Sequence, residues 1–152
     1  MGLIGNNACF SKNDLMCTPI IPNQTCAPSI HYITQHSADY PKRLFDLSDP
    51  PQKLFYVGNI RLLQEPMLAI VGARKASRAG LLYAQHFAAK LGLAGYHVIS
   101  GLAYGVDGAA HEGILGLEGQ SQTIAVCGNG LDSVYPPEHR GLAKQIAKAG
   151  LL

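Results

Sequence analysis

Short apolar runs and amphipathic segments alternate along the chain from residue 67 onward. The apolar runs are MLAIVG (67–72), YHVIS (96–100) and TIAVCG (123–128). A continuous apolar run that is bounded by glycine, as the first one is, is typical of a strand buried on both faces. We therefore predict three strands, of which the first is buried on both faces.

The segments between these runs have the spacing of helices. Ser77 can cap a helix that Gly95 ends, and its apolar positions recur at helical spacing: Leu81, Ala84, Phe87, Ala88 and Leu91. Further helices are predicted at about 106–117 and about 137–149, the last ended by Gly150. Strands alternating with helices imply right-handed crossovers. The predicted fold is therefore α/β with a mainly parallel sheet.

Residues before position 67 lack this alternation. We predict an irregular N-terminal segment (1–29) and a lead-in (30–66), followed by the partial α/β domain (67–152). In the lead-in, alternating residues predict short strands, and prolines on both sides delimit a short helix. The strands are IHYIT (30–34) and KLFYVGN (53–59), and the helix lies around 42–47.

Composition limits the classes of function without choosing one. Twelve Lys and Arg against ten Asp and Glu give a net charge of +2, too little to prove or exclude a polyanionic partner. Four cysteines, with no C-x-x-C pair, indicate neither a zinc site nor a disulfide framework: Cys9, Cys17, Cys26 and Cys127. The last reads as a small buried hydrophobic residue. No apolar run has membrane-spanning length and no secretory signal is evident, so a cytoplasmic protein is expected.

The three predicted strands are followed by glycine-containing loops. These loops are GARKAS (72–77), SGLAYGVD (100–107) and CGNGLDSVYPP (127–137). In an open parallel sheet the ligand crevice lies outside the carboxyl ends of the strands. Free backbone N–H groups at a helix N-terminus, together with cationic side chains, can bind a phosphate there. The candidate phosphate-binding residues are Gly72, Arg74, Lys75, Ser77, Arg78, Gly101, Leu102, Ala103, Gly105, Asn129 and Gly130. The alternative is that the cations are merely solvated.

Two titratable residues, Asp107 and His111, follow the second loop. Asp107 could be catalytic, but we interpret it as a residue that caps the helix and holds N–H groups of the loop. His111 lies one turn later on the same helix face. No third metal ligand is evident, so we interpret His111 as a hydrogen-bonded core histidine.

The standard nucleotide-binding and nucleophile motifs are absent: G-x-G-x-x-G, Walker A and G-x-S-x-G. A nucleotide enzyme and a binder of single strands both stay open from the residues alone. Tyr104, Tyr135 and His139 lie in or near the loops and could stack on bases, or could simply pack.

Taken together, these motifs resemble a known family. AIVGARKASRAG, VISGLAYGVDGAAHEGIL and TIAVCGNGLDSVYPPEHRGLAKQIAKAG, preceded by DYPKRLFDLSDPPQKLFYVGNIRLL, look like the DNA-processing protein A family (DprA, also called Smf), from about Ile30 to Leu152. The resemblance implies an extended, three-layer Rossmann-like fold. It also implies a dimeric binding protein without cofactor, rather than an enzyme. Such a protein protects incoming single-stranded DNA during natural transformation and loads the RecA recombinase.

The resemblance also implies roles for single residues. Arg74 corresponds to the family's phosphate-contacting arginine. Ser77, Gly101 and Gly105 fall in loops that line the same pocket, and 129–131 form the third loop.

The chain departs from the family pattern in three respects. Ala73 replaces a common hydroxyl residue, and Ala79 replaces a common tyrosine. The chain ends at KAGLL, where a fourth strand should begin, so the sheet is expected to be incomplete at the C-terminus with an unpaired apolar edge. In the family that the chain resembles, a basic segment of the DNA pocket and the usual dimer surface lie beyond that point. Weak binding of single strands by this chain alone is therefore expected.

Two further readings stay open at this stage. One is a nucleotide-processing enzyme related to phosphoribohydrolases, although the P-G-G-x-G-T loop of that group is absent. The other is a truncated copy without function.

Overall fold

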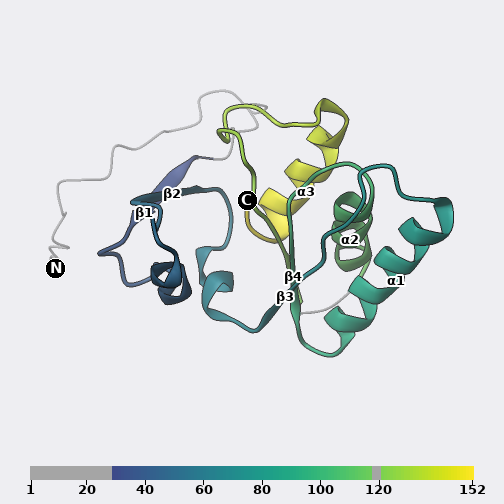
Figure 1. Cartoon of the computed structure of the whole chain (residues 1–152), viewed down its shortest axis with the longest axis horizontal. Coiled ribbons are helices and arrows are strands. Elements are labelled where there is room, and N and C mark those ends of the chain that lie inside the picture. The colour runs from purple at the N-terminus through teal and green to yellow at the C-terminus, as the bar shows by residue number, and fades with distance from the viewer. Residues whose placement is uncertain (1–28, 118–120) are drawn as a thin grey trace, which may run out of the picture.

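A three-stranded parallel sheet forms the centre of the protein (Figure 1). The computed structural model describes residues 29–117 and 121–152. The strands are β3 (Met67–Ala69), β4 (His97–Ser100) and β5 (Thr123–Ala125), adjacent in that order. Because the sheet grows in one direction, right-handed crossovers place the connecting helices on one face. Figure 1 shows α1 (Arg78–Leu93) and α2 (Val106–Leu115) on the side away from β1 and β2. The predicted α/β class is confirmed.

The helices form where capping residues and small apolar residues favour them. The Ser77 hydroxyl caps α1 by accepting the N–H of Gly80 at 3.1 Å, as predicted. Gly95, at φ +88°, follows the end of α1. A Cβ on Gly113 of α2 would lie 2.2 Å from the carbonyl oxygen of Gln85, so these two helices pack with their backbones close together. Buried side chains of α1, β4 and α2 complete this half of the core: Ala88, Val98, Ala110 and Ile114.

The lead-in lies on the opposite side of the sheet and contacts it through one buried cluster (Figure 1). β1 (His31–Thr34) pairs antiparallel with β2 (Lys53–Tyr56). A buried cluster joins Leu62 of the lead-in to Ile124 of β5 and to Leu151. The predicted helix around 42–47 is instead a short 3-10 helix, η1 (Lys42–Asp46), with prolines before and after it. A second 3-10 helix, η2 (Ile60–Gln64), follows β2.

The third helix of the α/β part begins with a 3-10 turn. Residues Pro137–His139 form η3, and α3 (Arg140–Ala149) continues to Gly150 as predicted. Its buried residues Ala143 and Ile146 pack with Leu102 and Ala125. Helix α2 ends at Leu115, two residues earlier than predicted.

The predicted burial of β3 on both faces is wrong: Leu68 is 43% exposed and the following Val71 is 73% exposed. The reason is that β3 lies at the edge of the sheet. Phe87 recurs at helical spacing with the core residues but is 60% exposed. It lies on α1, which packs on α2 and β4 with its other side.

The edge of β5 is paired, which corrects the expectation of an unpaired apolar edge. The N–H of Leu151 donates to Thr123 (3.1 Å), and the Leu151 carbonyl accepts from Ala125 (2.8 Å). Val57 and Leu152 then exchange two backbone hydrogen bonds of 3.1 and 2.9 Å. Residues 150–152 therefore lie between β5 and the backbone after β2, and Leu151 makes isolated bridges where a fourth strand was expected to begin.

Some sequence predictions fall on residues that the structure does not describe. The irregular segment predicted over 1–29 lies outside the described residues except for Ser29, and so do Cys9, Cys17 and Cys26. None of the described helices is both long and apolar enough to cross a membrane.

Candidate phosphate-binding site

The first two glycine loops meet at Gly105. Its backbone has φ +80° and ψ −125°, and a Cβ at this position would lie 2.2 Å from the carbonyl oxygen of Ala73. The carbonyl oxygen of Arg74 would be 2.6 Å away. The adjacent N–H of Val106 donates to the Ala73 carbonyl at 3.3 Å. Only glycine allows this close approach, which brings Arg74 and the 101–105 loop to the same edge of the sheet, as predicted.

Asp107 holds the second loop in place. One of its carboxylate oxygens accepts the N–H of Gly101 at 3.1 Å and that of Ala103 at 3.4 Å. The side chain is buried, and the N-cap position of α2 belongs to Gly105, so Asp107 fixes the loop without capping the helix. The prediction that Asp107 holds loop N–H groups is confirmed, and the prediction that it caps the helix is wrong. As a consequence, these two N–H groups are already occupied and are not free for a phosphate.

Leu102 contributes to the core rather than to the site surface. Its backbone has φ +60°, and its side chain is buried. The carbonyl oxygen of Leu102 lies 2.9 Å from Nδ1 of His139, at the start of α3. A Cβ on Gly108 would lie 2.9 Å from Cε1 of the same imidazole. His139 therefore packs on the first turn of α2 and ties it to the third loop.

Three cations and a hydroxyl gather at the N-terminus of α1. Arg74, Lys75, Ser77 and Arg78 are all exposed there, and Gly72 packs against Val106 behind them. The first turn of any α-helix leaves backbone N–H groups without intrahelical partners. Ser77 Oγ takes one of these, from Gly80, which leaves the N–H groups of Arg78 and Ala79 for a ligand.

The third loop adjoins the second at the end of β5. An ideal Cβ on Gly101 would lie 4.0 Å from the carbonyl oxygen of Val126, the residue after β5. Asn129 is exposed, and its amide nitrogen donates to the carbonyl of Ser133 at 2.6 Å and to that of Gly130 at 3.0 Å. The Asn129 amide thus shapes its own loop. All three loops therefore share one edge, with the cations on the first of them.

A clamp between the second and third loops was not predicted from the sequence. The hydroxyl of Tyr104 donates to the carboxylate of Glu138, and the Tyr104 ring meets that of His139 edge-on at 5.4 Å. The hydrogen bond to Glu138 raises the pKa of Tyr104 to about 12. The same bond lowers the pKa of Glu138. Tyr104 and Glu138 are 34 residues apart, so no local pattern could pair them.

His111 is the hydrogen-bonded core histidine that the sequence predicts. Its Nδ1 lies 2.6 Å from Oγ1 of Thr123, whose hydroxyl donates to the carbonyl of Val98. The Thr123 hydroxyl proton is engaged by Val98, so Nδ1 of His111 must carry the imidazole proton and donate to Thr123. Nε2 is then unprotonated, buried and without a hydrogen-bond partner among the described residues. Burial lowers the pKa of His111 to about 4, which makes the ring neutral at pH 7. In residues 29–117 and 121–152, no group of three His, Cys, Asp or Glu side chains could hold a metal.

Cys127 follows the third strand and differs slightly from its predicted state. The thiol is free and half-buried rather than fully buried, and burial raises its pKa. A raised pKa keeps the thiol protonated, so Cys127 behaves as an unreactive apolar group beside the third loop.

The geometry can be compared with known proteins. Residues 31–152 match the family of DNA recombination-mediator protein A. The chain belongs to this family. It is 37% identical to protein Smf of Synechocystis over 125 residues, 80% of this chain and 31% of that protein. It is 40% identical to DNA processing protein DprA of Streptococcus pneumoniae over 114 residues, 74% of this chain and 39% of that protein.

Two solved structures of the family have the same fold. The S. pneumoniae DprA structure superimposes with a TM-score of 0.73 at 35% identity, over 80% of this chain and 42% of that chain. DNA processing protein A of Helicobacter pylori, described for its single-stranded DNA binding mode, has a TM-score of 0.69 at 34% identity. It covers 79% of this chain, which corresponds to 53% of the other. The chain thus spans about a third of the length of the curated relatives and about half of the structural ones.

Proposed function

We propose that this chain binds the sugar-phosphate backbone of single-stranded DNA at the edge formed by the three loops. The observation that carries the proposal is the contact of Gly105 with the Ala73–Arg74 peptide, because it joins the cationic loop to the glycine loop. Arg74, Lys75 and Arg78 supply positive charge, and the first turn of α1 supplies N–H donors. Asp107 keeps the second loop rigid, so less conformational entropy is lost on binding.

Membership of the family supports DNA as the ligand. The H. pylori relative is described as binding single-stranded DNA. The missing nucleotide-binding motifs argue against a mononucleotide. For the longer family protein we propose the roles expected from the resemblance: protection of incoming DNA during transformation, loading of RecA, and action as a homodimer. Because this chain spans about a third of its curated relatives, we expect it to contribute part of the DNA site and to bind weakly alone.

We propose further that the site works by binding rather than by catalysis. Asp107 is engaged by two loop N–H groups, and His111 is buried against Thr123, so neither is poised for acid-base chemistry at the loops. A preparation of the chain should release no free base from nucleoside monophosphates. Release that Arg74→Ala abolishes would favour the nucleotide-processing alternative instead.

Fluorescence anisotropy with labelled oligo-dT tests the proposed function. The wild-type chain should bind weakly at low salt, and Arg74→Ala should bind more weakly still. Lys90→Ala is the matched control, because Lys90 lies in the last turn of α1, about 18 Å along the helix from Arg78. No wild-type binding at low salt, or equal losses in the two variants, would contradict the assignment.

A further inference from the structure

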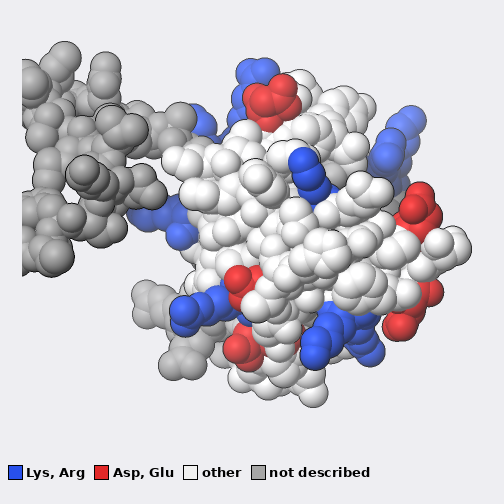
Figure 2. All heavy atoms as spheres, turned by 90° about the vertical axis from the view of Figure 1, so that its left-hand side faces the viewer, with Lys and Arg blue, Asp and Glu red and all other residues white. Residues whose placement is uncertain are grey.

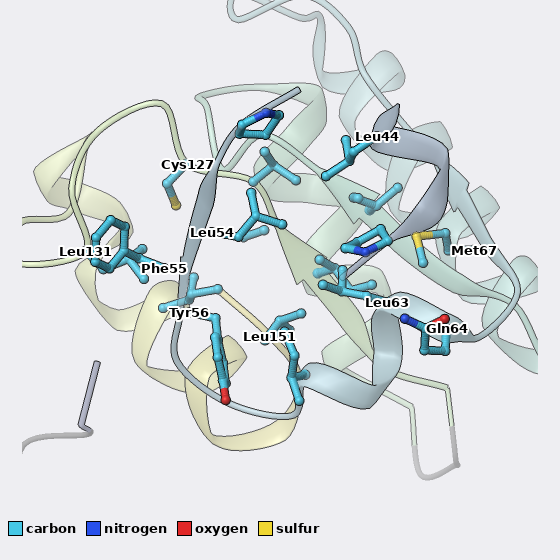
Figure 3. A pocket seen from close by; sticks show the side chains of 18 of the residues that line it. Leu44, Leu54, Phe55, Tyr56, Leu63, Gln64, Met67, Cys127, Leu131 and Leu151 are labelled. Carbon is cyan, nitrogen blue, oxygen red and sulfur yellow. The ribbon is translucent and has the colours of Figure 1, made fainter. Parts of the chain in front are cut away.

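A large cavity separates the lead-in from the sheet and reaches the third loop. Its volume is about 1240 Å³, and its walls are mainly apolar. One side is formed by β2, including Lys53, Leu54 and Phe55. The other side includes Ile99 and Ile124 on the sheet and residues 129–132 of the third loop. Phe55 and Leu131 both line the cavity and overlap in the view of Figure 3. The cavity therefore extends from the hairpin to the third loop, which adjoins the second loop at the edge where we place the phosphates.

The β1–β2 hairpin presents two aromatic rings to solvent beside this cavity. Tyr32 and Phe55 are cross-strand partners, with ring centroids 6.1 Å apart and planes inclined by 54°. They are 60% and 59% exposed. The ammonium of Lys53 lies 5.4 Å from the centre of the Tyr32 ring. The Lys53 ammonium thus lies over one face of the Tyr32 ring, and two largely exposed aromatic rings are held on the paired strands.

We propose that Tyr32, Phe55 and Lys53 form a second contact for single-stranded DNA, a platform on which bases stack after the strand leaves the loop edge. This inference rests on the proposed function of the loops. Stacking on aromatic rings tolerates any base, because every base has a π-face, and a neighbouring cation binds the backbone between stacked bases. The platform would bind the bases while the loops bind phosphates.

The charge around the hairpin supports a nucleic acid as the occupant. Lys53 is the only charged residue within the two strands. Two further basic residues, Lys42 and Arg43, line the cavity, and two acidic residues, Glu65 and Asp132, line it as well. Figure 2, which looks onto this side of the molecule, shows a largely uncharged face with both basic and acidic side chains around its margin, so the charge that favours a nucleic acid is that of Lys53 beside the rings. An apolar, aromatic surface with the Lys53 ammonium beside its rings fits unstacked bases joined by phosphates.

A tryptophan reporter tests the platform directly. The chain contains no tryptophan, so Phe55→Trp introduces a single indole at the proposed stacking position. Titration with unlabelled oligo-dT should quench its fluorescence, because a stacked base quenches an indole. The matched control is Phe87→Trp, at a position equally exposed on the outer side of α1, where no quenching is expected. Binding by Phe55→Trp without quenching would overturn the proposal.

Affinity measurements separate the platform from the loops. Phe55→Leu and Tyr32→Leu keep an apolar side chain but remove the ring, and each should weaken binding of long oligo-dT about five-fold or more, corresponding to about 1 kcal/mol or more per stacked base. Oligomers too short to extend beyond the loops should not show this loss. Lys53→Met should lower the slope of log K against log salt by about 0.7.

The outcomes distinguish the two proposals. Loss of affinity in Arg74→Ala with unchanged affinity in Tyr32→Leu and Phe55→Leu would overturn the platform and leave the proposed function standing. Loss of affinity in the hairpin variants with unchanged affinity in Arg74→Ala would overturn the loop site, and with it the proposal that one strand runs from the loops to the platform. If the hairpin variants change only the self-association of the chain, measured by sedimentation, the patch is a protein interface and the platform is wrong. Unfolding midpoints of all variants confirm that the hairpin stays folded.

Discussion

Adding one methyl group at Gly105 should push the first two loops apart. The Cβ of Gly105→Ala would lie 2.2 Å from the Ala73 carbonyl oxygen and 2.6 Å from that of Arg74. Contacts below 3.0 Å are not sustained, so the loops must separate by about 1 Å. The glycine-favouring backbone at φ +80° adds strain of about 1–3 kcal/mol, and the steric overlap adds about 1–3 kcal/mol more.

Gly95→Ala is the matched control for this variant. Gly95 has a similar φ of +88°, but an added Cβ meets nothing within 4 Å. It should therefore carry the backbone strain without the steric overlap. Urea unfolding should give a loss for Gly105→Ala that exceeds the loss for Gly95→Ala by about 1–3 kcal/mol. Under conditions where both are folded, only Gly105→Ala should lose affinity for oligo-dT. Equal losses of stability in the two variants would refute the loop contact.

Three further predictions concern the groups around the loops. Asp107→Asn should lower the free energy of unfolding by about 1.5–3 kcal/mol, because a buried carboxylate that accepts two N–H groups is lost. Asp132→Asn, at an exposed position, should leave the free energy of unfolding nearly unchanged in the same urea titration, and equal effects of the two variants would contradict the role of Asp107. The folded-state pKa of His111, about 4, lies below the value of about 6.5 in the unfolded chain, so acidification protonates the unfolded chain first. The stability present above pH 6.5 should therefore fall by up to about 3 kcal/mol as the pH falls to 4. His111→Gln should remove this part of the pH dependence, and identical pH profiles of the two proteins would contradict the prediction. Tyr104→Phe should raise the pKa of the Glu138 carboxyl, because the variant lacks the hydroxyl that stabilises the carboxylate. NMR titration of Glu138 measures this pKa, and an unchanged value would mean that the clamp does not form in solution.

Much of the α/β part could be predicted because its signals are local. Ser77 accepts the N–H of Gly80 three residues later, and Gly150 ends the last helix within the same turn. Such signals depend on the residues next to them, so the sequence carries them completely. The same holds for Asp107, whose two N–H donors lie four and six residues before it.

Burial could not be predicted where it depends on the neighbours of a whole element. The apolar run that forms β3 suggested a central strand, but its position at the sheet edge follows from strand order. Phe87 has the spacing of a core residue, yet its exposure follows from which helices pack against α1. The pairing of Leu152 with Val57 and the bond of Tyr104 to Glu138 join residues far apart in the sequence. No local pattern indicates such contacts.

The predicted meeting of the loops is confirmed, whereas the binding of phosphate there stays a proposal. The loops do meet at one edge, since Gly105 packs on the Ala73–Arg74 peptide. The glycines suggested free N–H groups throughout the second loop, but Asp107 occupies those of Gly101 and Ala103. The donors that stay available therefore shift toward the N-terminus of α1, next to the cations.

The salt dependence of single-strand binding tests the central claim most directly. If Arg74 contacts a phosphate, Arg74→Ala should weaken oligo-dT binding and lower the slope of log K against log salt by about 0.7 relative to wild type. Lys90→Ala, at the far end of α1, should keep the wild-type slope. A slope that Arg74→Ala leaves unchanged, or that both variants lower equally, would contradict a phosphate site at the meeting point of the loops.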